Sequence, residues 1–241
     1  MKILNKVLKR RLHLVFLDFE GTQFSHEMIA YGAVIASLKK DGSIRRIHKG
    51  IKGYVKPTNK IGKFVTDLTN ITEETLNKKG VSFEEAIDHI HSYCGRNFEK
   101  VLFVTFGDHD IRILNQSAMH SKKYNKDYLK QIKKYHFDLS GFINNYIKDE
   151  KNNSYSLENY LKVFNIEFSG EKHDPLADAI NLAHLYNAFV RNKKIVSEQY
   201  KKVLLNFKKI PAPLVELLKK LKEEEKVSIN DLEEIINKHL S

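Results

Sequence analysis

Apolar residues between positions 12 and 139 fall into short extended runs, a pattern typical of strands in a buried sheet. The first run, residues 12–20, reads Leu-His-Leu-Val-Phe-Leu-Asp-Phe-Glu and ends in acids. Asp41 and Gly42 predict a hairpin turn that leads from a second strand into a third. Further strands are predicted at residues 28–36, 53–55, 101–106 and 135–139.

Helical spacing alternates with these strands in the middle of the chain. Ser82 and Glu85 form a capping-box pattern at the start of one helix. Asp174 is a good N-cap, and Pro175 stands at the first position of a later helix. Strands in hairpin order, followed by alternating helices and strands, predict an α/β layer fold with a mixed sheet.

The pattern changes after Arg191, where no strand is predicted. Three amphipathic stretches follow, at residues 196–207, 214–221 and 232–240. Residues 191–241 contain 12 Lys and Arg against 8 Asp and Glu. We therefore expect a first domain over residues 1–190 and a basic helical extension over residues 191–241, whose protein partner the sequence does not identify.

Charge points to a polyanionic partner. The net charge is +11, which favours nucleic acid, although a lysine-rich composition also arises without any functional cause. The single cysteine, Cys94, excludes an intramolecular disulfide, and no apolar run is long enough to cross a membrane. The N-terminal residues lack the pattern of a signal peptide. We expect a cytoplasmic protein without a membrane partner.

Asp18 and Glu20 are the first candidate site residues. They stand two apart at the end of a strand, so both side chains leave the same face, about 7 Å apart. A divalent cation with a preference for oxygen ligands, Mg²⁺ or Mn²⁺, would relieve their repulsion. The alternative is that the strand has ended and both acids are simply solvated.

Two further acids and a histidine lie near other element ends. Asp110 follows the strand at 101–106 and can reach the first pair, because the carboxyl ends of neighbouring strands converge. Asp178 falls in the first turns of the helix that begins at Pro175, with His173 just before it. Helix capping by Asp108, Asp110 or Asp174 is the alternative for these acids.

Taken together, four carboxylates and one histidine are the set that two-metal phosphoryl transfer requires. Asp18, Glu20, Asp110 and Asp178 would hold two ions. The imidazole of His173, with an ordinary pKa near 6.5, would take a proton from the attacking water.

The three motifs resemble those of the DEDDh 3′→5′ exonucleases. Asp-Phe-Glu at 18–20, the acid at 110 and His-x-x-x-x-Asp at 173–178 match as a set, and the resemblance covers roughly residues 11–190. Supporting segments are 31–34, 55–57 and 67–72, and the segment Gly-Asp-His-Asp at 107–110 is similar to the subgroup with KapD and the histone-mRNA and small-RNA 3′ exonucleases.

The resemblance implies a ribonuclease-H-like fold, a mixed five-stranded sheet flanked by helices, and two Mg²⁺ or Mn²⁺ ions. It implies release of nucleoside 5′-monophosphates from a single-stranded 3′ end, with Gly21, Thr22 and Met28 near the terminal nucleotide. Two residues depart from the pattern: Asn70 replaces a glycine, which Asn tolerates at positive φ, and His109 replaces a tryptophan.

Three functions remain open at this point. RNA is favoured as substrate by the subgroup resemblance, whereas the site residues do not discriminate against DNA, as in repair or proofreading. A non-catalytic nucleic-acid-binding module is the third. The densest basic stretch, residues 122–134, either guides a phosphate backbone, with tyrosines stacking on bases, or is a solvated helix face with its tyrosines turned inward.

Overall fold

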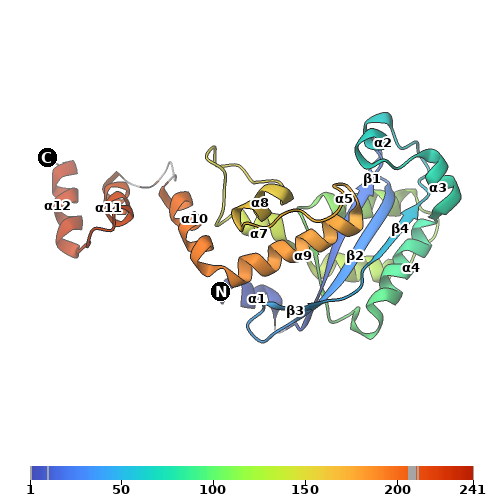
Figure 1. Cartoon of the computed structure of the whole chain (residues 1–241), viewed down its shortest axis with the longest axis horizontal. Helices are drawn as coiled ribbons and strands as arrows, with labels where there is room; N and C mark the ends of the chain where they lie inside the picture. Colours follow the sequence, from blue (N-terminus) through green and yellow to red (C-terminus); the bar gives the residue numbers. More distant parts are fainter. Residues whose placement is uncertain (1, 10, 206–209, 211, 241) are drawn as a thin grey trace. The chain divides into compact units, whose positions relative to one another are not determined.

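The computed structural model describes residues 2–9, 11–205, 210 and 212–240, and it contains one mixed sheet (Figure 1). The strands run in the order β5-β4-β2-β1-β6-β7, with β3 also paired to β2. β1 pairs antiparallel with β2 and parallel with β6. The strands are β1 (His13–Gly21), β2 (Met28–Leu38), β3 (Ile44–Ile47), β4 (Ile51–Val55), β5 (Gly80–Val81), β6 (Leu102–Thr105) and β7 (His136–Asp138).

The α/β class and the mixed sheet predicted from the sequence are confirmed, but the sheet has seven strands where five were expected. The shortest strand, β5, has two residues and exists through its pairing with Tyr54 and Val55 of β4. A segment that short has no apolar period of its own to read.

Helices cover both faces of the sheet, and further helices follow it along the chain. In the described residues they are α1 (Lys2–Leu8), α2 (Lys63–Thr69), α3 (Glu73–Lys79), α4 (Phe83–Cys94), a 3₁₀ turn (Gly95–Asn97), α5 (His109–His120), α6 (Lys126–Lys134), α7 (Leu139–Ile143), α8 (Leu157–Val163), α9 (Pro175–Arg191), α10 (Lys193–Leu205), α11 (Ala212–Lys222) and α12 (Ile229–Leu240).

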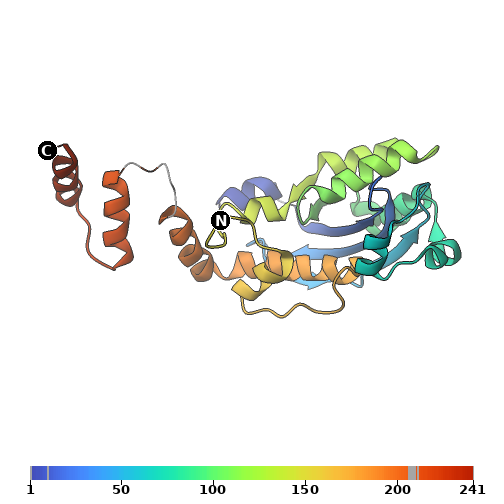
Figure 2. The same cartoon turned by 90° about the horizontal axis from the view of Figure 1, so that it is seen from above.

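Alternation along β1 sends its side chains to two different layers. Val15, Leu17 and Phe19 are buried in the core that α4, α5 and α6 cover. Phe16 points the other way, and its ring lies 5.7 Å from that of Tyr186 on α9. Figure 2 shows the two layers, with α9 in orange on one side of the strands and the green helices α5 and α6 on the other. Asp18 and Glu20 follow the alternation of Phe16, so their side chains lie on the face of the sheet that α9 covers.

Local signals in the sequence correspond to local structure. Gly42 closes the β2–β3 turn at φ 85°, and Asn70 ends α2 at φ 57°, the positive value expected where the resemblance has a glycine. Both bonds of the Ser82–Glu85 capping box are present. The Asp174 side chain accepts from the N–H groups of Leu176 and Ala177, with Pro175 at the start of the helix.

The chain divides into two compact units. One comprises residues 1–142 and 156–192, and the other comprises residues 143–155 and 193–241. The second contains α10, α11 and α12, which cover much of the predicted amphipathic stretches, although residues 206–209 lie outside the described part. In it, Lys220 pairs with Asp231 at 3.1 Å and Lys238 with Glu216 at 3.2 Å.

Candidate active site

β1 carries the first two acids to the side of the sheet that faces α9. Asp18 lies opposite Gly32 of β2, and Glu20 lies opposite Ala30. Small residues at these two partners leave space above the acids. A Cβ at Gly32 would come within 2.0 Å of the carbonyl oxygen of Pro175, so the first turn of α9 rests directly on β2 at this point. The absence of a side chain at Gly32 therefore lets α9 approach Asp18.

Asp110 enters the site from the first turn of α5. Its side chain is buried, and its Oδ1 accepts a hydrogen bond of 2.7 Å from the backbone N–H of Phe19, between the two acids of β1. Asp108 stands at the N-cap position without any side-chain capping bond. Asp110 is thus held to β1 rather than used as a helix cap.

His173 and Asp178 approach from the start of α9. His173 has a φ of 61°, and its backbone N–H donates to Asp178 Oδ2 at 3.0 Å. Its Nδ1 lies 3.8 Å from Glu20 Oε1. Glu20, His173 and Asp178 each offer a ligand atom, and these atoms all lie within 4.8 Å of one another. The structure therefore brings together residues that are more than 150 positions apart in the sequence.

Burial and mutual repulsion raise the pKa of all four acids. The pKa of Asp18 is raised by burial and then by the charges of Asp110, Asp178 and Glu20. Burial and the charge of Asp178 raise the pKa of Glu20 to about 8. Burial raises the pKa of Asp110 to about 7 against the opposing hydrogen bond from the Phe19 N–H, and that of Asp178 to about 6 against the bond from His173.

This electrostatic balance fits a divalent cation. Acids that raise one another's pKa share one pocket, and a positive charge among them would relieve their repulsion and lower these pKa values. Glu20, Asp178 and His173 form the tightest group, while Asp18 and Asp110 lie outside that 4.8 Å group but close enough to interact electrostatically with it. Oxygen ligands suit Mg²⁺ and Mn²⁺, and the four carboxylates are the residues that would hold such ions.

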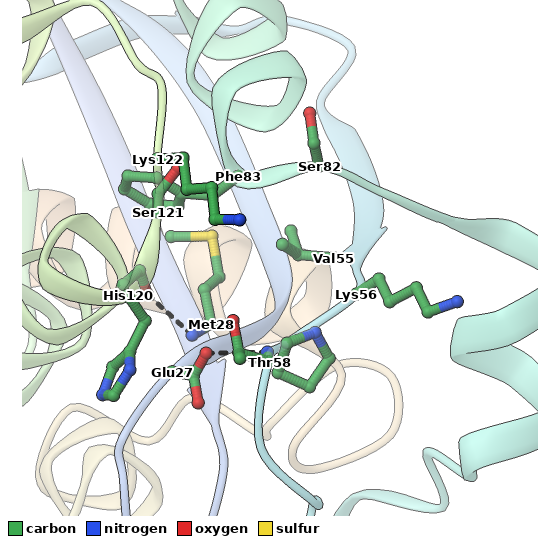
Figure 3. A pocket seen from close by; sticks show the side chains of 12 residues that line it. Glu27, Met28, Val55, Lys56, Thr58, Ser82, Phe83, His120, Ser121 and Lys122 are labelled. Carbon is green, nitrogen blue, oxygen red and sulfur yellow. Dashed lines mark hydrogen bonds between the residues drawn. The ribbon is translucent and has the colours of Figure 1, made fainter.

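The three residues expected near the terminal nucleotide lie in different surroundings. Gly21 and Thr22 follow Glu20 directly, and the hydroxyl of Thr22 accepts from the N–H of Glu27 at 2.9 Å. Met28 is buried, and its side chain lines a pocket of about 250 Å³ on the α4 and α5 side of the sheet (Figure 3). Met28 therefore borders a separate hollow, with its backbone N–H bonded to the hydroxyl of Ser117.

Sequence reasoning missed Glu27, whose carboxylate organises the loops beside the site. It accepts from the backbone N–H groups of Thr58 at 2.8 Å and Asn59 at 3.0 Å, which ties the segment before α2 to the turn after β1. These bonds and those from Ser25 lower the pKa of Glu27 although burial opposes them. The partners are about 30 positions away in the chain, so no local pattern marks this acid.

Lys52 and Asp138 were missed for the same reason. Lys52 on β4 pairs with Asp174 at 2.5 Å and holds the N-terminus of α9. Asp138 on β7 accepts from the N–H of Gly107 at 2.8 Å and so fixes the loop that precedes α5. Each of these residues supports an element that carries a site acid.

Solved structures share this fold. A 3′-exonuclease described for 3′-end specific recognition of a histone mRNA stem-loop is 18% identical, with a TM-score of 0.63 over 79% of this chain and 70% of that one. The nuclease domain of 3′hExo, a DEDDh family member bound to rAMP, is 21% identical, with a TM-score of 0.57 over 77% and 93% of the two chains.

E. coli exonuclease I in complex with a dA16 oligonucleotide is 17% identical, with a TM-score of 0.57 over 80% of this chain. This chain covers 44% of exonuclease I. No curated protein sequence matches the chain. At such identities the structural likeness establishes the fold.

The mixed α/β sheet and the acidic pocket at the end of β1 define the class of protein: an exonuclease that acts on nucleic acid. The family model described as RNase T, exonuclease, matches residues 15–186. The chain therefore belongs to this exonuclease family, and the recognition of a DEDDh 3′→5′ exonuclease is confirmed. Among the described residues, no helix combines the length and apolar character of a membrane span.

Proposed function

We propose that the protein is a metal-dependent exonuclease that removes nucleotides from the 3′ end of single-stranded nucleic acid, with RNA favoured, and releases nucleoside 5′-monophosphates. The observation that carries this proposal is the meeting of Glu20, His173 and Asp178 within 4.8 Å, beside Asp18 and the buried Asp110. A solvated set of acids would have no reason to gather in one partly buried pocket.

In the proposed mechanism, Asp18, Glu20, Asp110 and Asp178 would hold two Mg²⁺ or Mn²⁺ ions. When bound, such ions would lower the pKa of the attacking water and stabilise the leaving 3′ oxygen. His173 takes the proton from the water. Burial and the nearby Lys172 lower the pKa of His173, which keeps its imidazole neutral and able to accept that proton at neutral pH.

The backbone around Gly21 and Thr22 is proposed to border the terminal nucleotide, because it continues β1 directly past Glu20. Met28 is proposed for the same role, because its backbone pairs with that of Gly21. Its side chain lines the pocket of Figure 3, where it would contact the substrate beyond the terminal nucleotide.

We further propose that residues 1–190 form the catalytic domain and residues 191–241 a basic helical extension. The family match over residues 15–186 supports the first limit. The single cysteine, Cys94, is buried and free, which agrees with the proposed cytoplasmic location.

Digestion of single-stranded RNA labelled at its 3′ or 5′ end tests the proposal, with Mg²⁺ or Mn²⁺ titrated into the reaction. We expect the 3′ label to appear at once as a mononucleotide and the 5′-labelled strand to shorten in steps. EDTA should abolish the reaction. Activity in EDTA, or shortening from the 5′ end, would contradict the proposal.

DNA is the second candidate substrate, because exonuclease I was solved with a deoxyoligonucleotide. Matched RNA and DNA strands of one sequence, digested side by side, decide between them. Faster trimming of DNA would reverse the ranking. A non-catalytic binding module is the third candidate. It requires that the wild-type protein and Asp18→Ala both bind nucleic acid and that neither cleaves it. Our proposal requires that the wild-type protein cleave and that Asp18→Ala lose cleavage while it keeps the fold and most of the affinity.

A further inference from the structure

Positive charge is concentrated in one short segment away from the carboxylates. Residues 122–134 contain six lysines and one acid, a net of +5 out of +11 for the whole chain. The acid, Asp127, lies in the first turn of α6. The lysines are Lys122, Lys123, Lys126, Lys130, Lys133 and Lys134.

α6 sorts these lysines onto its outer face. Leu129 and Ile132 are buried in the core, whereas Lys126, Lys130, Lys133 and Lys134 recur at the spacing of one helical face. With Tyr124 and Leu129 these four lysines line a shallow hollow of about 500 Å³. In the described part of the chain, no carboxylate pairs with any of them.

The tyrosines of the segment pack against the core, which favours the alternative in which they are turned inward. The ring of Tyr128 stacks on His91, with centroids 3.8 Å apart and planes at 7°. Tyr124 lines the hollow but also packs edge-on against Phe83, with centroids 5.8 Å apart. Positive charge therefore dominates this surface, which suits a phosphate backbone better than bases.

Both ends of this lysine-rich segment lie close to elements that carry site residues. Lys133 Nζ donates to Asn115 Oδ1 of α5 at 2.7 Å. Asn115 is five residues after Asp110, about 7.5 Å along the helix, and the exposed Arg112 lies between them. At the other end, Lys122 points into the pocket that Met28 lines, and Met28 pairs with Gly21 next to Glu20 (Figure 3).

We propose that Lys122, Lys126, Lys130, Lys133 and Lys134, here called the lysine face, bind the phosphate backbone of a single-stranded nucleic acid upstream of the nucleotide being removed. The inference rests on the proposed function for the identity of the strand, and it adds a second contact that the carboxylates do not supply. Lysines that pair with no carboxylate of the described residues can hold phosphates without reading the base sequence, because their contacts to phosphate are ionic.

The salt dependence of binding tests the lysine face. In EDTA, where the proposed site does not cleave, affinity for a labelled single-stranded RNA of about 20 nucleotides is measured by anisotropy between 50 and 200 mM salt. Lys126→Gln with Lys130→Gln removes two phosphate contacts. The slope of log affinity against log salt should therefore fall by about 1.4, with ~25-fold weaker binding at 0.1 M salt.

Lys39→Gln with Lys40→Gln is the matched control, because it makes the same charge change at two exposed lysines. These lie in the β2–β3 turn, at the far end of an 11-residue strand from Met28, about 36 Å along the strand. The control should keep the wild-type slope. Three results would overturn the proposal. They are a wild-type slope in the α6 variant, an equal loss of affinity in both variants, and no measurable binding of RNA by the wild-type protein.

Cleavage of a dinucleotide separates this inference from the proposed function, because the inference places the lysine face upstream of the nucleotide being removed. With Mn²⁺ present, the α6 variant should cleave the dinucleotide at the wild-type rate and longer RNA more slowly. Failure of the wild-type protein to cleave either substrate would contradict the proposed function. The binding measurement in EDTA would still test the lysine face, because it does not depend on cleavage. Loss of binding to anionic lipid vesicles, with an unchanged RNA slope, would instead assign the face to membranes and overturn the proposal.

Discussion

Asp110 is the buried acid of the site, and the Phe19 N–H holds one of its oxygens. Asp110→Asn should keep that bond through the amide oxygen while removing the charge. We expect an intact fold and at least a 100-fold lower kcat, about 2.7 kcal/mol of lost transition-state stabilisation. Asp108→Asn, two residues away and exposed, is the control and should cleave like wild type. Equal activity of the two variants would remove Asp110 from the site.

His173 makes a separate prediction through the pH dependence of cleavage. His173→Ala should lower kcat by about 10²- to 10⁴-fold, the usual contribution of a general base. Burial and then the charge of Lys172 lower the His173 pKa, so the wild-type rate should fall only below pH 6.5 on the acid side. Lys172→Gln should keep kcat and move that fall to slightly higher pH. An acid limb that is identical in His173→Ala and wild type would contradict the role.

The residues that the sequence marked and those it missed differ in how far their partners lie along the chain. The sequence predicts Asp18 and Glu20 from strand alternation and Asp174 from helix capping, because alternation and capping depend on residues only a few positions apart. Glu27 depends on Thr58 and Asn59, and Lys52 depends on Asp174. Such partners meet only after folding, so spacing alone gives no sign of them.

At the scale of elements, the N-terminus of α9 decides whether His173 and Asp178 reach β1. Asp174 caps this helix and also pairs with Lys52. Asp174→Asn preserves the cap and removes the ion pair, whereas Asp174→Ala removes both. We expect Asp174→Ala to lose about 1 kcal/mol more unfolding free energy than Asp174→Asn, by urea denaturation. Equal losses would mean that the cap contributes nothing here.

The strands also differ in whether a local sequence pattern predicts them. β1, β2 and β6 are long apolar runs, and their place in the sheet follows from hairpin order and alternation with helices. β5 has no pattern, since its two residues are defined by β4 alone. The patterns in the sequence therefore predicted every strand except β5, whereas the five strands implied by the resemblance were two too few; the fold class was right.

At the scale of the whole molecule, the raised acid pKa values link stability to pH and metal. The folded pKa of Glu20, about 8, lies above its ordinary 4.5, so the folded state binds more protons than the unfolded state in that interval. Unfolding free energy should therefore fall as pH rises from about 5 to 8 in EDTA. Mn²⁺ at 100 times its Kd should add ~2.7 kcal/mol and raise Tm by several degrees at pH 8.

A scan of Tm against pH, with and without Mn²⁺, checks this linkage. Two parallel curves would show that the ion does not engage the acids whose pKa values are raised. Convergence of the curves toward pH 5, where protons compete with the ion for the carboxylates, is the expected result.

The central claim is that the four acids share divalent ions in one pocket, and ion stoichiometry tests it most directly. Mn²⁺ binding is titrated by calorimetry at pH 7.5, with a nucleoside 5′-monophosphate present to complete the coordination. The account predicts two ions per chain for the wild-type protein, and weaker or fewer ions for Asp18→Asn and Glu20→Gln. Their Tm in EDTA should be at least that of wild type, because each change removes a charge that repels the other acids. Wild-type protein that binds no Mn²⁺ at millimolar concentration, or variants that bind as wild type does, would contradict it.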